Sequence, residues 1–157
     1  MKRKGIKSCL VIDLNFLGDM LMSSPVMRCL KKNGVHRVDV IAYDFCVPIL
    51  EKNPYIDNIY PVKKHAWWQA IKAGFRRYDL VMQLNTSFKT NLLLLLAGNE
   101  RLGYSYKWKG LPLTIKVPLN RRTATRGNRV RECLNLLAEG LGFNCDNEDM
   151  IYYADCD

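Results

Sequence analysis

Residues 10–19 read L-V-I-D-L-N-F-L-G-D, and this stretch decides the fold that we predict for the chain. Its apolar first half, with Val and Ile at the centre, is typical of a buried parallel strand over Ser8–Leu14. A short loop follows, and Asp19 lies where a helix begins. In open α/β sheets, ligands bind beyond the carboxyl ends of the strands. Asp19 is therefore either a reactive group in such a site or the cap of the helix.

The start of that helix has two interpretations because of Pro25. Apolar residues recur at helical spacing up to Lys31–Lys32, and Asn33–Gly34 ends the helix. Either Asp19 caps the first turn and Pro25 kinks the helix, or Ser24 is the N-cap and Pro25 takes the first helical position. The sequence leaves both open.

Strand-like and helix-like segments alternate through the rest of the chain. We expect further strands at 37–42, 56–62, 78–84 and 101–104, an extended piece at 113–117, and helices at 45–52, 66–77, 88–97 and 129–141. This rhythm predicts an α/β fold, a doubly wound Rossmann-like parallel sheet with helices on both faces. We predict one domain over residues 1–143, with 144–157 as a terminal segment or the start of a linker.

The charge of the chain is unevenly distributed. The net charge is +9, but residues 63–131 alone carry fifteen Lys and Arg against two acids, and residues 132–157 carry seven acids and no Lys or Arg. The cationic middle predicts an anionic partner or pairing with the acidic end of the chain. No apolar run approaches the roughly 20 residues of a membrane span, and no signal peptide is evident.

The motifs of several site classes are missing. The six cysteines form no C-x-x-C pair and the two histidines stand apart from them, so we predict no zinc site, and free thiols that lie partly in the core. The loop after the first strand lacks G-x-G-x-x-G, and no G-K-[ST] of a P-loop occurs. Asp19 remains as a candidate general base, a role that contributes about 100- to 10,000-fold to a rate.

Four stretches resemble a known family. L-G-D-M-L-M-S-S-P around Asp19 is similar to the G-D-x-x-x-[ST]-x-P opening of the lipopolysaccharide heptosyltransferases, glycosyltransferase family 9. Tyr78–Gly98 resembles the family's Y-D-L-V-I-D-L-Q-G-S-x-[KR]-[ST] strand and helix, Arg101–Tyr104 its R-I-G-[FY], and Glu51–Ile56 its x-x-N-P-x-I. The four matches occur in the family's order.

The resemblance implies the N-terminal half of a two-domain GT-B glycosyltransferase. In the family this half binds the acceptor, and the aspartate that matches Asp19 is the general base of an inverting transfer. The C-terminal domain, which would bind the ADP-heptose donor, is absent from the sequence. No metal and no cofactor other than this donor substrate is implied. The candidate acceptor-binding residues are Asn15, Gly18, Lys64, Asn85, Ser87, Lys89, Arg122, Arg126 and Arg129.

The acceptor implied by the resemblance is a lipopolysaccharide core or lipid-linked sugar in the cytoplasm, which suggests peripheral contact with the inner membrane. Trp67–Trp68 and nearby lysines fit a membrane-surface helix, although packing of this stripe on the sheet is commoner. One rival function is a basic α/β module that binds nucleic acid or another polyanion; it lacks a recognisable nucleic-acid motif. A receiver-like domain would need more acids after the first strand than Asp13 and Asp19.

Overall fold

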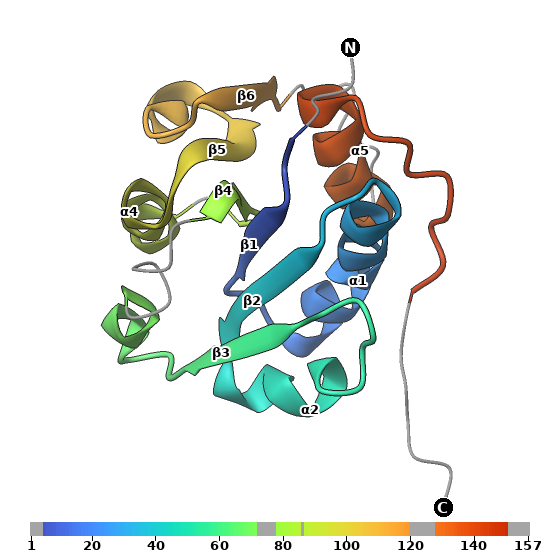
Figure 1. The fold of residues 1–157 in the computed structure, drawn as a ribbon. Coiled ribbons are helices and arrows are strands. Elements are labelled where there is room, and N and C mark those ends of the chain that lie inside the picture. The colour runs from blue at the N-terminus through green and yellow to red at the C-terminus, as the bar shows by residue number, and fades with distance from the viewer. Residues whose placement is uncertain (1–4, 72–77, 86, 120–127, 151–157) are drawn as a thin grey trace, which may run out of the picture.

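The computed structural model describes residues 5–71, 78–85, 87–119 and 128–150, and it is built around a six-stranded sheet (Figure 1). The strands lie in the order β3-β2-β1-β4-β5-β6, and every neighbouring pair is parallel. Their bounds are Ser8–Asp13 (β1), Arg37–Tyr43 (β2), Asn58–Val62 (β3), Tyr78–Gln83 (β4), Gly98–Ser105 (β5) and Ile115–Pro118 (β6). This is the doubly wound, Rossmann-like order, so the predicted fold class is confirmed.

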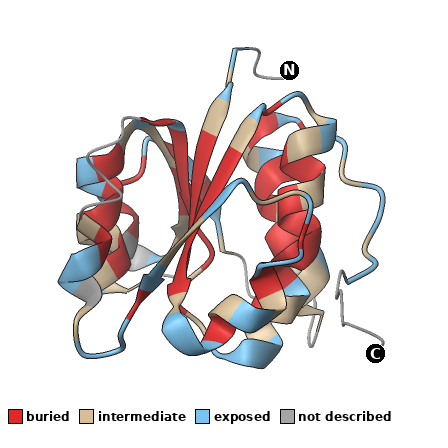
Figure 2. Ribbon diagram, turned by 60° about the horizontal axis from the view of Figure 1, so that its bottom comes forward, coloured by how far each residue is buried: buried red, intermediate tan, exposed pale blue. Residues whose placement is uncertain are grey.

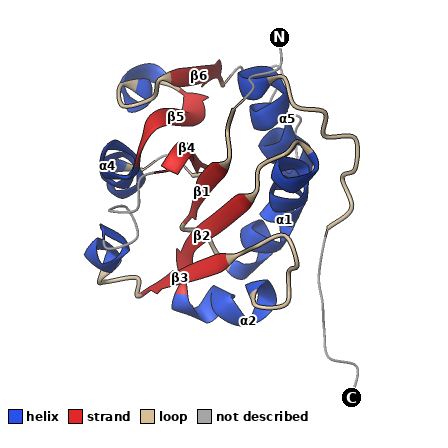
Figure 3. Cartoon of the chain, in the orientation of Figure 1, coloured by secondary structure: helices blue, strands red, loops and turns tan. Residues whose placement is uncertain are grey.

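Helices cover both faces of the sheet, as Figures 1 and 3 show. One face carries α1 (Leu17–Lys32), α2 (Val47–Leu50, preceded by the 3₁₀ turn η1 at Asp44–Cys46) and α5 (Arg129–Leu141). The other face carries α4 (Phe88–Ala97), the 3₁₀ turn η2 (Trp67–Ala70) and a third such turn, η3 (Lys107–Gly110). We call these the α1 face and the α4 face.

Burial on both faces explains the unbroken apolar run of β1. Val11 packs in the core of the α1 face, whereas Leu10 and Ile12 pack in the core of the α4 face. In Figure 2 the strands form a buried layer between two sets of helices whose outer surfaces are exposed. A central parallel strand needs apolar residues at every position for this reason.

Several boundaries differ from the sequence prediction. The expected helix at 45–52 is a 3₁₀ turn and one short helical turn, and the expected helix at 66–77 begins as η2, while residues 72–77 lie outside the described part. The fifth strand is longer than predicted because it starts directly at Gly98. A Cβ there would lie 2.6 Å from Val81 and 2.8 Å from the Tyr78 carbonyl oxygen, so only glycine lets β5 begin this close to β4.

Two glycines shape the C-terminal end of α5. Gly142 ends the helix in the left-handed conformation, with a φ of 68°. Gly140 lies against the sheet, and a Cβ at that position would come within 2.4 Å of Leu102 and 3.3 Å of Val117. α5 therefore packs more closely on β5 and β6 than any larger residue would allow.

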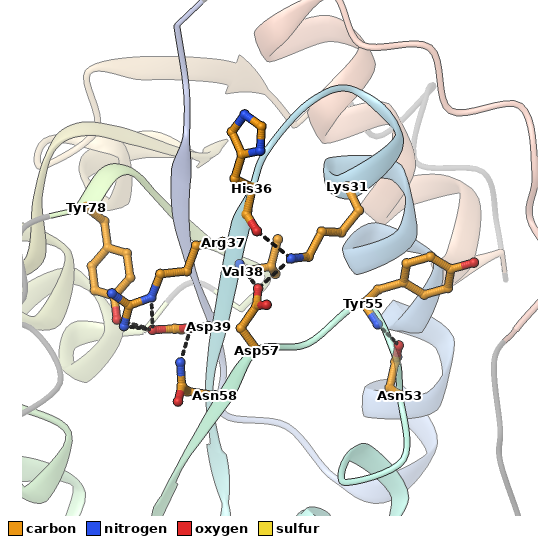
Figure 4. Close-up of polar contacts among 10 residues, drawn as sticks. All are labelled: Lys31, His36, Arg37, Val38, Asp39, Asn53, Tyr55, Asp57, Asn58 and Tyr78. Carbon is orange, nitrogen blue, oxygen red and sulfur yellow. Dashed lines mark hydrogen bonds and ion pairs between the residues drawn. The ribbon is translucent and has the colours of Figure 1, made fainter.

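A buried polar cluster on the α4 face joins β2, β3 and β4 (Figure 4). The Asp39 carboxylate is fully buried and accepts hydrogen bonds from Arg37 (2.6 Å), Asn58 (3.0 Å) and the Tyr78 hydroxyl (2.6 Å). Burial alone would raise the pKa of Asp39, but these hydrogen bonds lower it below its ordinary value. The cluster lies near the start of β2, away from the loop that contains Asp19, and we assign it a structural role.

The prediction of free thiols is wrong for Cys29 and Cys145, which form a disulfide bond. The bond ties α1 to the chain after α5, across 116 residues of sequence. Sequence spacing gave no sign of it, because the pairing depends on α1 and α5 lying side by side on one face. Cys9, Cys46 and Cys133 are free and buried, as predicted.

Residues 144–149 are held against α1, which bears on the predicted boundary after residue 143. The Asn33 side chain donates to the Asn144 carbonyl oxygen (2.9 Å), and Arg28 donates to the carbonyl oxygens of Asn147 and Asp149 (both 2.9 Å). These residues form no helix or strand. The boundary itself stays a prediction. None of the helices in the described part of the chain is long and apolar enough to cross a membrane.

Candidate functional site

The candidate site lies at the carboxyl end of β1, where the order of the strands reverses. The chain continues from β1 to β2 and β3 on one side and returns to β4, β5 and β6 on the other. Such a switch point leaves a crevice between two diverging loops, here the loops after β1 and β4. The Asn85 side chain in the second loop donates to Asn15 Oδ1 in the first loop, at 2.8 Å, and so bridges them.

Asp19 lies in the first turn of α1, and neither interpretation of the helix start is correct. α1 begins at Leu17, after an extended Phe16 whose side chain makes no cap, and runs through Pro25 to Lys32. Asp19 is half-buried, and no hydrogen bond to another described residue occupies its carboxylate. Its charge complements the helix dipole, which favours a negative group at this end. Within the described part of the chain, no hydrogen-bond donor competes with a ligand for this carboxylate.

Asp13 ends β1 beneath this turn and is completely buried. It accepts hydrogen bonds from Ser23 Oγ and from Asn15 Nδ2, both at 2.6 Å. Burial raises the pKa of Asp13 above its ordinary value, although these two hydrogen bonds and the Arg129 guanidinium oppose the shift. The sequence analysis gave Asp13 and Ser23 no role in the site. The sequence did contain a signal for Asp13: a carboxylate at the end of an otherwise apolar, buried strand must find hydrogen-bond partners in the interior.

Arg129 reaches the same place from the start of α5. It donates to the Leu84 carbonyl oxygen at the end of β4 and forms an ion pair with Glu132, at 2.8 Å. Burial by itself would lower the pKa of the guanidinium, but nearby acidic groups, including Glu132 and Asp13, raise it, so Arg129 keeps its charge. The structure thus brings together Asn15, Asn85 and Arg129, three residues far apart in sequence.

Lys64 joins the site through an aromatic cluster. Its ammonium lies 5.4 Å from the centroid of the Phe16 ring, which is 64% exposed. Phe16 stacks with Phe45 (6.3 Å between centroids), and Phe45 stacks with Tyr43 (5.4 Å). We call Phe16, Tyr43 and Phe45 the aromatic platform. It places apolar ring faces and a cation beside the first turn of α1.

The remaining predicted residues are placed less directly. Ser87 caps α4 in a capping box with Thr90, whose hydroxyl also donates to the Asn85 carbonyl oxygen (2.9 Å), so Ser87 helps to hold the loop after β4. Gly18 is exposed on the first turn of α1. Lys89 is half-buried on α4, without a described contact to the other site residues. Arg122 and Arg126 lie outside the described residues.

Comparisons with known proteins agree with this picture. The chain matches no protein-family model. It is 34% identical to lipopolysaccharide heptosyltransferase 3 of Escherichia coli over 105 residues, which cover 59% of this chain and 31% of that protein. It is 30% identical to lipooligosaccharide heptosyltransferase 2 of Haemophilus ducreyi over 109 residues, covering 64% of this chain and 30% of that protein. The chain thus spans about a third of the length of these relatives.

Solved structures share the fold. A glycosyltransferase of family 9 from Veillonella parvula superposes with a TM-score of 0.79 over 94% of this chain and 44% of that chain, at 21% identity. The E. coli heptosyltransferase WaaC with ADP gives a TM-score of 0.74 over 92% of this chain and 50% of that chain, at 18% identity. The chain is therefore similar in sequence to part of the lipopolysaccharide heptosyltransferases, and it shares its fold with part of the solved family 9 structures.

Proposed function

We propose that the chain is the acceptor-binding part of an inverting heptosyltransferase, which moves heptose from ADP-heptose to a phosphorylated lipopolysaccharide core. The observation that carries the proposal is the Asp19 carboxylate, which lies at the switch point of the sheet and is used by no hydrogen bond among the described residues. The names of the relatives support the activity, and one related structure contains ADP-2-deoxy-2-fluoro heptose.

In the proposed reaction, Asp19 acts as the general base. Its carboxylate takes the proton from the acceptor hydroxyl as that oxygen attacks C1 of the donor heptose. The new C1–O bond forms on the face opposite the leaving group, while the bond between C1 and the ADP oxygen breaks and ADP leaves with the electron pair. This carboxylate can serve the role, because none of the residues that the structure describes competes with the acceptor hydroxyl as a hydrogen-bond donor.

The residues around Asp19 have the chemistry of an acceptor site. Lys64 and Arg129 supply positive charge for phosphate groups, and the Asn15–Asn85 pair supplies amide groups for sugar hydroxyls. The aromatic platform offers ring faces to the apolar face of a sugar ring. Gly18, Lys89, Arg122 and Arg126 stay predicted contacts.

We further propose that the donor is held mainly by a second domain and that no cofactor takes part. The reaction would then occur on the cytoplasmic side of the inner membrane, where a nucleotide-sugar is available. Isothermal titration calorimetry of this chain tests the donor assignment. We expect no binding of ADP-heptose at micromolar concentration, and micromolar affinity would show that the donor site lies within these residues.

The base assignment is tested in a chimera in which this chain replaces the matching part of E. coli lipopolysaccharide heptosyltransferase 3. We expect Asp19→Asn to lower the rate of heptose transfer by about 100- to 10,000-fold, because the amide cannot accept the proton. Thermal melting should fall by only a few degrees, because losing the charge at the start of α1 costs about 1 kcal/mol or less. Transfer is measured as ADP released from ADP-heptose in the presence of a phosphorylated core acceptor.

The matched control is Glu51→Gln, which makes the same change from acid to amide at an exposed residue after α2. We expect this variant to retain full transfer. Full turnover by the Asp19→Asn chimera would rule out Asp19 as the base.

A further inference from the structure

An apolar groove lies on the α4 face, outside the candidate site. It has a volume of about 410 Å³. One wall is formed by Phe88, Leu92 and Leu95 of α4, and the other by Trp108, Leu111 and Pro112 in and after η3. We call it the α4–η3 groove.

The side chains of this groove are unusually exposed for their size and type. Trp108 is 82% exposed, Phe88 81% and Leu111 70%. They form one continuous surface, whereas isolated apolar residues on a protein surface need no explanation. Such a surface is normally covered by a partner when the protein is at work.

α4 is apolar on two opposite sides, which supports the same conclusion. Leu93, Leu94 and Ala97 are buried in the core of the α4 face. Phe88, Leu92 and Leu95 follow at i, i+4 and i+7 and form a second stripe along the groove. A surface helix needs only the first stripe for folding. The second stripe therefore serves something other than the core.

Basic residues outnumber acidic ones in the stretch of chain that forms the groove. Residues 88–118 carry five Lys and Arg and one acid. Side chains alternate along a strand, and Leu102 and Ile115 pack in the core of the α1 face, so Arg101 and Lys116 lie on the α4 face with the groove. Glu100, the acid of this stretch, shares the side of Leu102. Lys107 and Lys109 flank Trp108 in sequence.

We propose that the α4–η3 groove and its basic surround form a docking surface for an anionic phospholipid bilayer. Exposed Trp, Phe and Leu side chains would enter the boundary between head groups and acyl chains, and the cations would contact the phosphates. A second copy of the chain would bring the same positive charge to the contact, so electrostatics favours lipid over self-association.

The groove lies close to the candidate site, so membrane docking would help to bring a lipid-linked acceptor to it; this role rests on the proposed function. α4 begins at the carboxyl edge of the sheet, and Phe88 is three residues after Asn85, which contacts Asn15 in the candidate site. A bilayer on this surface would keep a lipid-linked acceptor close to Asp19. It also relocates the membrane contact suggested by sequence from Trp67–Trp68 to Trp108.

Co-sedimentation with vesicles tests the docking surface. We expect the chain to bind vesicles of phosphatidylglycerol and phosphatidylethanolamine and to bind pure phosphatidylcholine at least about tenfold more weakly. The double substitution Trp108→Ser with Leu111→Ser should reduce binding to the anionic vesicles by about tenfold or more. Phe88→Ser, on the opposite wall, should also weaken binding.

The matched control is Trp68→Ser, because Trp68 is 56% exposed on η2, which covers the same face of the sheet. This variant should bind like the unchanged chain, and circular dichroism should show that all variants are folded. Absence of vesicle binding, or equal loss in the Trp68 variant, would overturn the proposal. So would a dimer in analytical ultracentrifugation that Trp108→Ser with Leu111→Ser dissociates, since a second copy would then cover the groove. Vesicle binding needs neither donor nor acceptor, so its failure is distinct from failure of the Asp19 test.

Discussion

At the scale of single residues, Asp13 has the most unusual environment in the candidate site. Its carboxyl group is fully buried, receives hydrogen bonds from Ser23 and Asn15, and lies near the charged Arg129. These contacts fix Asn15 on one side and the first turns of α1 on the other. Asp13 is thus a positioning residue, which acts on Asp19 and Asn15 through the geometry of their loop.

The pKa of Asp13 leads to a prediction about stability and pH. Because burial raises this pKa in the folded state, ionising the carboxyl costs more in the fold than in the unfolded chain. Its contribution to stability is therefore greatest at low pH and declines as the pH rises from about 4 through the raised pKa. We expect Asp13→Asn to become progressively more stable relative to the unchanged chain over this pH range, as measured by urea denaturation.

Asn suits this test because its amide can keep both contacts: its oxygen can accept from Asn15, and its nitrogen can donate to Ser23. Asp13→Ala is the contrasting variant, because it removes the acceptor of the half-buried Asn15 amide, at about 1–3 kcal/mol, while Ser23 keeps its hydrogen bond to the Met20 carbonyl oxygen. A difference between Asp13→Asn and the unchanged chain that does not vary with pH would contradict the raised pKa.

The site residues also show how far sequence reasoning can reach at this scale. Asp19, Asn15, Asn85 and Arg129 could be named from motif resemblance and charge, and the fold brings the last three together. That Asn15 would hydrogen-bond to Asn85 depends on β1 and β4 being neighbours, which no local pattern contains. Ser87 caps α4, which the sequence analysis did not predict, and its contact with a ligand stays a prediction.

At the scale of elements, the strands and helices with strong periodicity were predicted well. α4 and α5 begin and end at the predicted residues, and β1, β2 and β4 differ by one residue at one end. The weaker predictions concern segments whose structure depends on packing. The chain after Gly98 is a strand because Gly98 fits closely against β4, and that contact is not visible in the sequence. The Cys29–Cys145 bond was missed for the same reason.

That bond leads to a prediction about α1 and the segment after α5. Closing a loop of this length destabilises the unfolded chain by about 5 kcal/mol in the chain-entropy model. We therefore expect dithiothreitol to lower the free energy of unfolding by several kcal/mol, measured by urea denaturation. Cys145→Ser should have the lowered value from the start and should not respond to dithiothreitol. If dithiothreitol destabilised this variant equally, the destabilisation would not come from reduction of the Cys29–Cys145 bond.

At the scale of the whole molecule, charge is separated along the chain and partly compensated in the fold. Part of the acidic C-terminal stretch pairs internally, since Glu148 lies 2.9 Å from Arg131 of α5. Lys64, at the opposite side of the candidate site, has no such partner among the described residues; its recorded contact is the Phe16 ring. The Lys64 ammonium therefore keeps its charge uncompensated by a described acid on the side where the proposed acceptor would bind.

This distribution predicts salt-dependent binding of the acceptor. We expect the affinity of the chain for a phosphorylated heptose-containing core oligosaccharide to fall about five- to tenfold between 50 and 300 mM NaCl, because salt screens exposed charges. The same oligosaccharide without phosphate should bind weakly and respond little to salt. Calorimetric titrations at both salt concentrations would measure this, and equal salt responses would argue against recognition of phosphate.

The close packing of Gly140 on the sheet also affects Arg129, at the other end of α5. The two ends of α5 contact different parts of the sheet. Gly140 packs against β5 and β6 near the C-terminal end of the helix, and Arg129 donates to the Leu84 carbonyl oxygen at its N-terminal end. The two residues are about 16 Å apart along the helix axis. A methyl group at position 140 would clash with Leu102 and push the C-terminal end of α5 away from the sheet, which would tilt the helix. We expect this change to displace the Arg129 guanidinium, although position 140 has no contact with the candidate site itself.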